Sequence, residues 1–173
     1  MLRAPATMFT QAARRSSTRC RATCVRHLVS IGVAAPDRIA CAGRSYGGYL
    51  TLAALVFRPD LFVAGVDICG MADFHTFYAH TEPWIAEAAY PKYGHPVHDE
   101  ALLRSLSPIH RFDALRAPIL VVHGENDTNV PLEEALQVVD GSPRYLEWLE
   151  RELAPASEED KLKHVQLQPG QPA

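Results

Sequence analysis

The stretch that decides the fold is Arg38-Ile39-Ala40-Cys41-Ala42-Gly43-Arg44-Ser45-Tyr46-Gly47-Gly48. It begins as an apolar run, entered through Pro36-Asp37, and continues as the pattern G-x-S-x-G with one further glycine. A short apolar run bounded by turn residues predicts a buried strand, here over residues 38–42. Ser45 follows that run directly, so we expect it on the turn at the end of the strand.

Two further apolar runs, residues 62–69 and 118–123, also predict strands. Their hydrophobic residues are continuous rather than alternating, which is typical of parallel strands covered on both faces. Helical patterns lie before, between and after the three runs, at residues 25–31, 47–57 and 131–139. Alternation of strand and helix predicts an α/β fold with a parallel sheet and flanking helices.

A serine on a tight strand-to-helix turn has a chemical use. The backbone there is strained, and glycines two residues before and after the serine, Gly43 and Gly47, relieve crowding between strand and helix. Such a turn directs the hydroxyl of Ser45 out of the sheet and the N–H of Tyr46 toward a developing oxyanion. The alternative is a glycine-rich turn with an incidental serine.

A second motif, His123-Gly124-Glu125-Asn126-Asp127-Thr128-Asn129-Val130-Pro131, follows the third predicted strand. Asp127 would therefore lie at the carboxyl edge of the sheet, where catalytic groups of α/β proteins gather. A carboxylate there can orient a histidine and stabilise its charged form. The alternative is an Asx-type turn that caps the next helix.

With both motifs in view, the chain resembles the catalytic domain of the prolyl oligopeptidase family of serine peptidases, most of all its acylaminoacyl-peptidase and dipeptidyl-aminopeptidase-like branch. The likeness is carried by residues 36–49, by Pro59-Asp60-Leu61-Phe62 with Val66 to Gly70, and by Leu120 to Pro131, within a match over about residues 25–139. The resemblance implies a partial α/β-hydrolase fold, with Ser45 as nucleophile, Asp127 as acid and the Tyr46 amide as an oxyanion donor. It implies cleavage of short peptides or acylated amino acids through an acyl-enzyme, without a cofactor.

The chain departs from the family pattern in its histidine and in its ends. His164 is the only histidine after Asp127 and lacks the expected glycine before it; His95 is expected in a surface turn, and His123 as a brace of the acid loop. Only 37 residues precede Arg38, so we expect the N-terminal strands of the fold to be missing. The tail shows no further convincing strand, so we expect the last strand to be missing as well. An exposed sheet edge would then favour self-association.

The sequence divides into an irregular, disordered leader over residues 1–24, the partial hydrolase domain over 25–140, and an atypical tail over 141–173 with one short amphipathic segment at 145–153. Between the second and third strands, residues 70–117 form a long aromatic-rich insertion. We expect one or two short helices there, one of them near residues 99–105. Such an insertion commonly covers a site, and a simple structural cover is the alternative.

Composition excludes several classes of function. A net charge of −3 and a pI near 6.2 do not suggest a nucleic-acid or membrane partner, and no apolar run is long enough for a membrane helix. Cys20, Cys24 and His27 lack a fourth metal ligand, so we expect no metal and a cytoplasmic protein with reduced thiols. Serine peptidase is thus the leading function, with an esterase or other acyl hydrolase on the same fold, or a truncated non-catalytic or partner-dependent module, as alternatives.

Overall fold

The computed structural model describes residues 22–142, and these hold a three-stranded parallel sheet in the order β1-β2-β3. The strands are β1 (Ala40–Arg44), β2 (Ala64–Ile68) and β3 (Ile119–Val122). All three predicted strands are therefore confirmed, with β1 displaced two residues toward the C-terminus. Because the strands are parallel, their carboxyl ends meet at one edge of the sheet.

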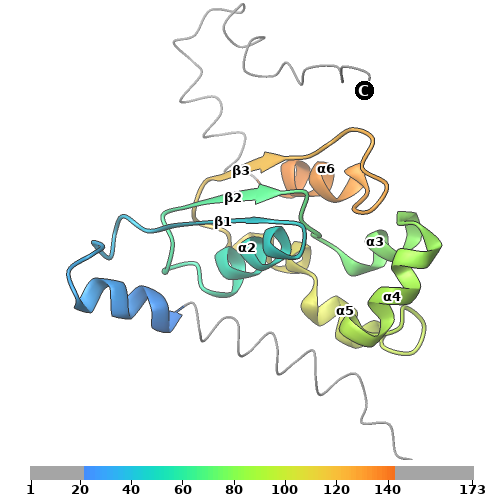
Figure 1. Cartoon of the computed structure of the whole chain (residues 1–173), viewed down its shortest axis with the longest axis horizontal. Helices are drawn as coiled ribbons and strands as arrows, with labels where there is room; N and C mark the ends of the chain where they lie inside the picture. Colours follow the sequence, from blue (N-terminus) through green and yellow to red (C-terminus); the bar gives the residue numbers. More distant parts are fainter. Residues whose placement is uncertain (1–21, 143–173) are drawn as a thin grey trace, which may run out of the picture.

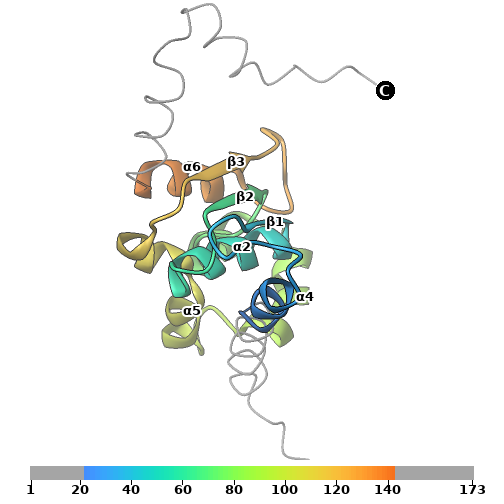
Figure 2. The ribbon, with the colours of Figure 1, turned by 90° about the vertical axis from the view of Figure 1, so that its left-hand side faces the viewer.

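Helices pack on one face of this sheet, as Figures 1 and 2 show from two sides. The central helix is α2 (Tyr46–Phe57), which packs on β1 and β2, while α6 (Leu132–Gly141) lies beside β3. Gly65 of β2 lets α2 approach closely, since a Cβ there would meet the Leu55 side chain at 2.5 Å. Residues 22–30 form one further helix, so the chain is already helical at Ala22, before the predicted start at Val25.

The insertion between β2 and β3 contains more helix than the sequence predicts. It forms α3 (Phe74–His80), α4 (Pro83–Tyr93), α5 (Glu100–Leu106) and the 3-10 helix η1 (Pro108–Ala114). Pro83 takes the first helical position of α4, where its missing N–H costs nothing, and Pro91 lies in the last turn. Figure 1 shows α3, α4 and α5 gathered beyond the carboxyl ends of the strands.

Two apolar clusters hold these layers together. The first joins α2, β3, η1 and α6 through residues that include Leu52, Leu55, Phe112, Ile119 and Val138. The second packs α2 against the insertion and includes Tyr49, Phe74, Phe77, Leu103 and Val130. The second cluster therefore fixes the insertion against the end of the sheet that carries Ser45.

The opposite face of the sheet is exposed in this part of the chain. Ala40, Ala42 and Arg44 of β1 are exposed, and so are Leu120 (46%) and Val122 (42%) of β3. We call these five residues the open face. The expectation that the strands are covered on both faces is thus wrong for β1 and β3 over residues 22–142, because α2, η1 and α6 all lie on the other side.

Most of the expected leader and tail lie outside the residues that the structure describes, and so do the amphipathic segment 145–153 and His164. Over residues 22–142, no helix is long and apolar enough to cross a membrane.

Candidate active site

Ser45 occupies a strained turn between β1 and α2. Its φ of 55° and ψ of −119° lie in a region that residues with a side chain rarely adopt. The side chain is exposed, and the backbone N–H donates to the carbonyl of Ile68 at 2.8 Å. The turn thus presents the hydroxyl at the carboxyl edge of the sheet. Tyr46 is the first residue of α2, and the first backbone N–H groups of a helix have no acceptor within that helix.

The three glycines around Ser45 differ in how much space a side chain would have. A Cβ on Gly43 would lie 2.1 Å from the carbonyl oxygen of Gly47, so strand and helix can approach there only without a side chain. A Cβ on Gly47 would meet nothing within 4 Å, whereas one on Gly48 would meet Asp67 Oδ1 at 2.3 Å and the Gly70 backbone. The expected crowding is therefore confirmed at Gly43 and wrong for Gly47, where a side chain would enter open space; the second crowded glycine is Gly48.

A buried carboxyl group packs beside the turn at Ser45. Asp67, in β2, is 1% exposed and lies between Gly48 and Gly70, and its Oδ1 has no hydrogen-bond partner in the described structure. Burial raises the pKa of Asp67 to about 7; the hydrogen bond from the Gly70 N–H opposes this, and the charge of Glu134 adds to it. The sequence reading missed this residue, although a charge inside the apolar run Val66-Asp67-Ile68 was an available signal.

Asp127 lies in the loop after β3, as the sequence predicts. Its Oδ1 accepts the backbone N–H groups of Asn129 at 2.9 Å and Val130 at 3.0 Å. This is the Asx-type turn considered as the alternative, but the N-cap of α6 is Pro131 and Asp127 makes no capping bond to that helix. Within residues 22–142, Oδ2 of Asp127 accepts no hydrogen bond, so one carboxylate oxygen stays available to another donor.

The histidines near these residues have structural contacts. His123 is buried, and its Nε2 lies 2.8 Å from the carbonyl oxygen of Val130, so it braces the acid loop as expected. His95 follows α4 in a turn, where its Nδ1 accepts the N–H of Val97. Neither geometry assigns a base to Ser45, and the role of His164 stays a prediction.

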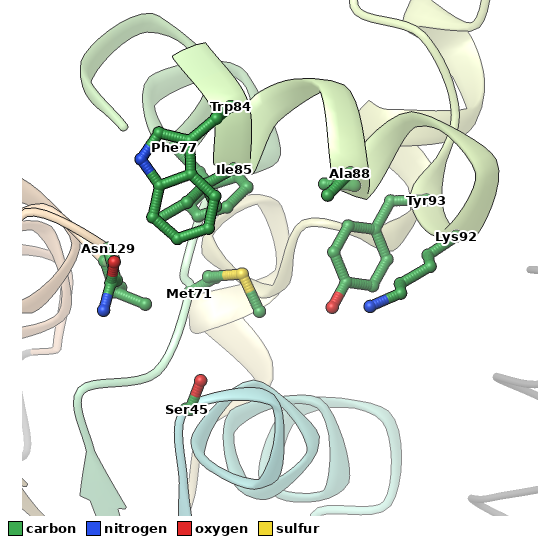
Figure 3. A pocket seen from close by; sticks show the side chains of 11 residues that line it. Ser45, Met71, Phe77, Trp84, Ile85, Ala88, Lys92, Tyr93 and Asn129 are labelled. Carbon is green, nitrogen blue, oxygen red and sulfur yellow. The ribbon is translucent and has the colours of Figure 1, made fainter. Parts of the chain in front are cut away.

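A pocket of about 290 Å³ opens beside Ser45 (Figure 3). The insertion lines it with Met71, Phe77, Trp84, Ile85, Ala88, Ala89, Lys92 and Tyr93, and the acid loop adds Asn129 and Val130. The serine of the first motif and the loop of the second therefore border one cavity. The insertion forms its outer wall, as expected for a segment that covers a site.

Glu134 connects this wall to α6, and the sequence reading missed it as well. It is fully buried; Oε2 accepts the N–H groups of Ala72 and Asp73 at 2.8 Å each, and Oε1 accepts the hydroxyl of Thr76. Burial raises the pKa of Glu134, although these three hydrogen bonds oppose the rise. The carboxylate thus holds the loop that carries Met71 against the helix that follows the acid loop.

Within residues 22–142, no three His, Cys, Asp or Glu side chains gather as metal ligands. Cys24, Cys41 and Cys69 form no disulfide within residues 22–142.

Comparison with known proteins gives consistent matches. The model of the prolyl oligopeptidase family matches residues 19–141. Dipeptidyl aminopeptidase BIII of Pseudoxanthomonas mexicana is 38% identical over 120 residues, and the acylamino-acid-releasing enzyme of Arabidopsis thaliana is 30% identical over 123. Each match covers 66% of this chain but only 17% and 16% of those proteins, so the chain spans about a sixth of their length.

Solved structures agree in fold. A puromycin-hydrolyzing peptidase of Mycobacterium tuberculosis superposes with a TM-score of 0.62 at 30% identity, covering 68% of this chain and 18% of that one. The acylaminoacyl peptidase of Pyrococcus horikoshii gives 0.60 at 27% identity, over 68% of this chain and 19% of that one. The parallel sheet with its flanking helices is therefore part of an α/β-hydrolase fold. By its matched residues and its architecture, the chain belongs to the prolyl oligopeptidase family.

Proposed function

We propose that the chain carries part of the hydrolase domain of a serine-type peptidase, with Ser45 as nucleophile and Asp127 as the acid of its triad. One observation carries the proposal: a strained serine stands at a pocket that the acid loop also lines. The hydroxyl would attack the scissile carbonyl while a histidine accepts its proton, and the Tyr46 N–H would stabilise the oxyanion. Water then hydrolyses the acyl-enzyme, and no cofactor takes part.

The substrates proposed are short peptides or acylated amino acids. The names of two relatives, a dipeptidyl aminopeptidase and an acylamino-acid-releasing enzyme, support this class. We also propose a cytoplasmic location, which the thiols of Cys24 and Cys69, outside any disulfide, support because cytoplasmic thiols are kept reduced. His164, the histidine downstream of Asp127, is the candidate base.

A fluorophosphonate probe tests the nucleophile directly. The wild-type chain should be labelled and Ser45→Ala should not, while Ser105→Ala, which removes an exposed serine on α5, should label as the wild type does. Asp127→Asn keeps an oxygen for the loop's two N–H groups but loses the charge, so it should slow labelling without unfolding the loop. An unlabelled wild-type chain would contradict the proposal.

Two other functions have support of their own. An esterase would use the same serine, because a strained turn does not identify the leaving group; faster turnover of p-nitrophenyl esters than of aminoacyl anilides would favour it. A non-catalytic, partner-dependent module is favoured by the open face, where Leu120 and Val122 are exposed. Such a module would resist the probe alone and self-associate through its sheet.

A further inference from the structure

Helix α4 forms one wall of the pocket beside Ser45. The polar groups of this wall are unevenly distributed. Trp84, Ile85, Ala88 and Ala89 make its surface apolar, and Lys92 is the charged residue among those that line the pocket. In Figure 3 the ammonium of Lys92 and the hydroxyl of Tyr93 end side by side, and Met71 lies between them and Ser45 in that view. The pocket therefore has a nucleophile at one end, an apolar middle and hydrogen-bond donors at the other end.

We propose that this pocket selects a substrate side chain that crosses its apolar middle and ends in a carboxylate, which Lys92 and Tyr93 bind. The inference rests on the proposed function and names the substrate class of the same site. Lys92 is thereby a specificity-determining residue, and Tyr93 supplies a second donor to the same anion.

The chemistry of the two donors favours an anion. An ammonium only donates hydrogen bonds, and bonds between charged partners are about twice as strong as neutral ones. Burial, with the neighbouring Tyr46, raises the pKa of Tyr93 to about 12, so its hydroxyl keeps its proton at neutral pH and can donate. Glutamate should fit better than aspartate, because its two methylene groups span more of the apolar middle.

Lys92 also has a purely structural explanation. It lies in the last turn of α4, where a cation interacts favourably with the helix dipole. That explanation predicts no preference among ligands, so the two explanations separate in a binding experiment. Because Lys92 is exposed, water screens its charge, and the preference should be small, about two- to fivefold.

Calorimetry on the Ser45→Ala chain tests the proposal without turnover. The ligands are N-acetyl dipeptide amides that end in glutamate, glutamine or lysine, so that only the side chain differs. The glutamate peptide should bind about two- to fivefold more tightly than the glutamine peptide. Lys92→Met should abolish this ratio, Lys92→Glu should shift the preference to the lysine peptide, and Arg104→Met, which removes an exposed cation on α5, should preserve it.

Equal binding of the glutamate and glutamine peptides, a preference that survives in Lys92→Met, or no binding of either peptide to a chain that melts cooperatively would each overturn the proposal. Fluorophosphonate labelling of the wild type separates this failure from that of the proposed function. Labelled Ser45 without a glutamate preference contradicts only the carboxylate site. An unlabelled chain that still prefers glutamate contradicts only the peptidase.

Discussion

The backbone N–H of Ser45 donates to the carbonyl oxygen of Ile68 at 2.8 Å, which joins the strained turn to the neighbouring strand. The register continues the parallel ladder, since Arg44 pairs with Ile68. Unfavourable backbone angles such as those of Ser45 persist only where the surrounding structure holds them. The second strand of the sheet is therefore part of what keeps the Ser45 hydroxyl at the pocket.

Gly48→Ala should destabilise the fold, whereas Gly47→Ala should not. A methyl group at Gly48 would meet Asp67 Oδ1 at 2.3 Å and the Gly70 Cα at 2.7 Å, and one of these neighbours is backbone that cannot rotate away. We expect a loss of about 2 kcal/mol or more from the free energy of unfolding, as for other overpacked sites. Chemical denaturation followed by circular dichroism measures it.

Gly47→Ala is the matched control one residue away. Its added methyl group meets no atom within 4 Å, and alanine is favoured over glycine in a helix by up to about 1 kcal/mol. A Gly48→Ala chain as stable as Gly47→Ala would show that the close approach to Asp67 does not constrain the fold.

Asp67→Asn should flatten the dependence of stability on pH. The pKa of Asp67 is raised from 3.8 to about 7, so the folded chain binds its proton more tightly than the unfolded chain does. Stability from this group is therefore greatest below pH 4 and is lost as the pH rises toward and through 7, by at most about 4 kcal/mol. Denaturation midpoints at pH 5 and pH 8 measure the difference, which should be smaller in Asp67→Asn.

Asp113→Asn serves as the control for this pH series, because Asp113 is exposed on η1. It should lose stability between pH 5 and pH 8 as the wild type does. If Asp67→Asn and the wild type lose the same amount, then Asp67 does not carry the buried proton.

Glu134→Ala should loosen the loop that carries Met71. The substitution removes the acceptor of two backbone N–H groups and one hydroxyl, all in the segment from Ala72 to Thr76. Unsatisfied buried donors cost about 1–3 kcal/mol each, so we expect a loss of at least about 2 kcal/mol. Hydrogen exchange at the Ala72 and Asp73 amides should accelerate by more than the loss in the free energy of global unfolding accounts for.

The neighbouring Glu133 is exposed, and Glu133→Ala should leave both stability and exchange close to those of the wild type. Equal exchange rates at Ala72 in the two variants would mean that the Glu134 carboxylate does not hold this loop.

Local patterns predicted the three strands and the turn at Ser45 because these depend on neighbours in the sequence. When a strand ends and a helix begins within a few residues, with a glycine between them, the chain has few possible conformations. The two buried carboxyl groups depend on contacts between distant segments: Glu134 and Ala72 are 62 positions apart. Nothing in the pair Glu133-Glu134 distinguishes the buried residue from the exposed one.

The helices of the insertion were underestimated for a related reason. The insertion contains Pro83 and Pro91, and both lie in α4, at its first position and in its last turn, where proline is tolerated. The aromatic side chains in this region, such as Phe74 and Phe77, pack against α2 rather than form a loop surface. Lys92 and Tyr93 reach the pocket only because α4 folds back over Ser45, which no local pattern indicates.

We expect the chain to self-associate through the open face, so replacing Leu120 and Val122 by polar residues should reduce that association. Both belong to the open face and are 46% and 42% exposed on the edge strand β3. Exposed apolar strands at a sheet edge favour pairing with a second copy, so Leu120→Ser/Val122→Thr should move the sedimentation profile toward the monomer at a given concentration. Leu136→Ser is the control, because Leu136 is 54% exposed on α6, on the other side of the sheet. A profile that responds to Leu136→Ser but not to the double substitution would place the contact on the helical side.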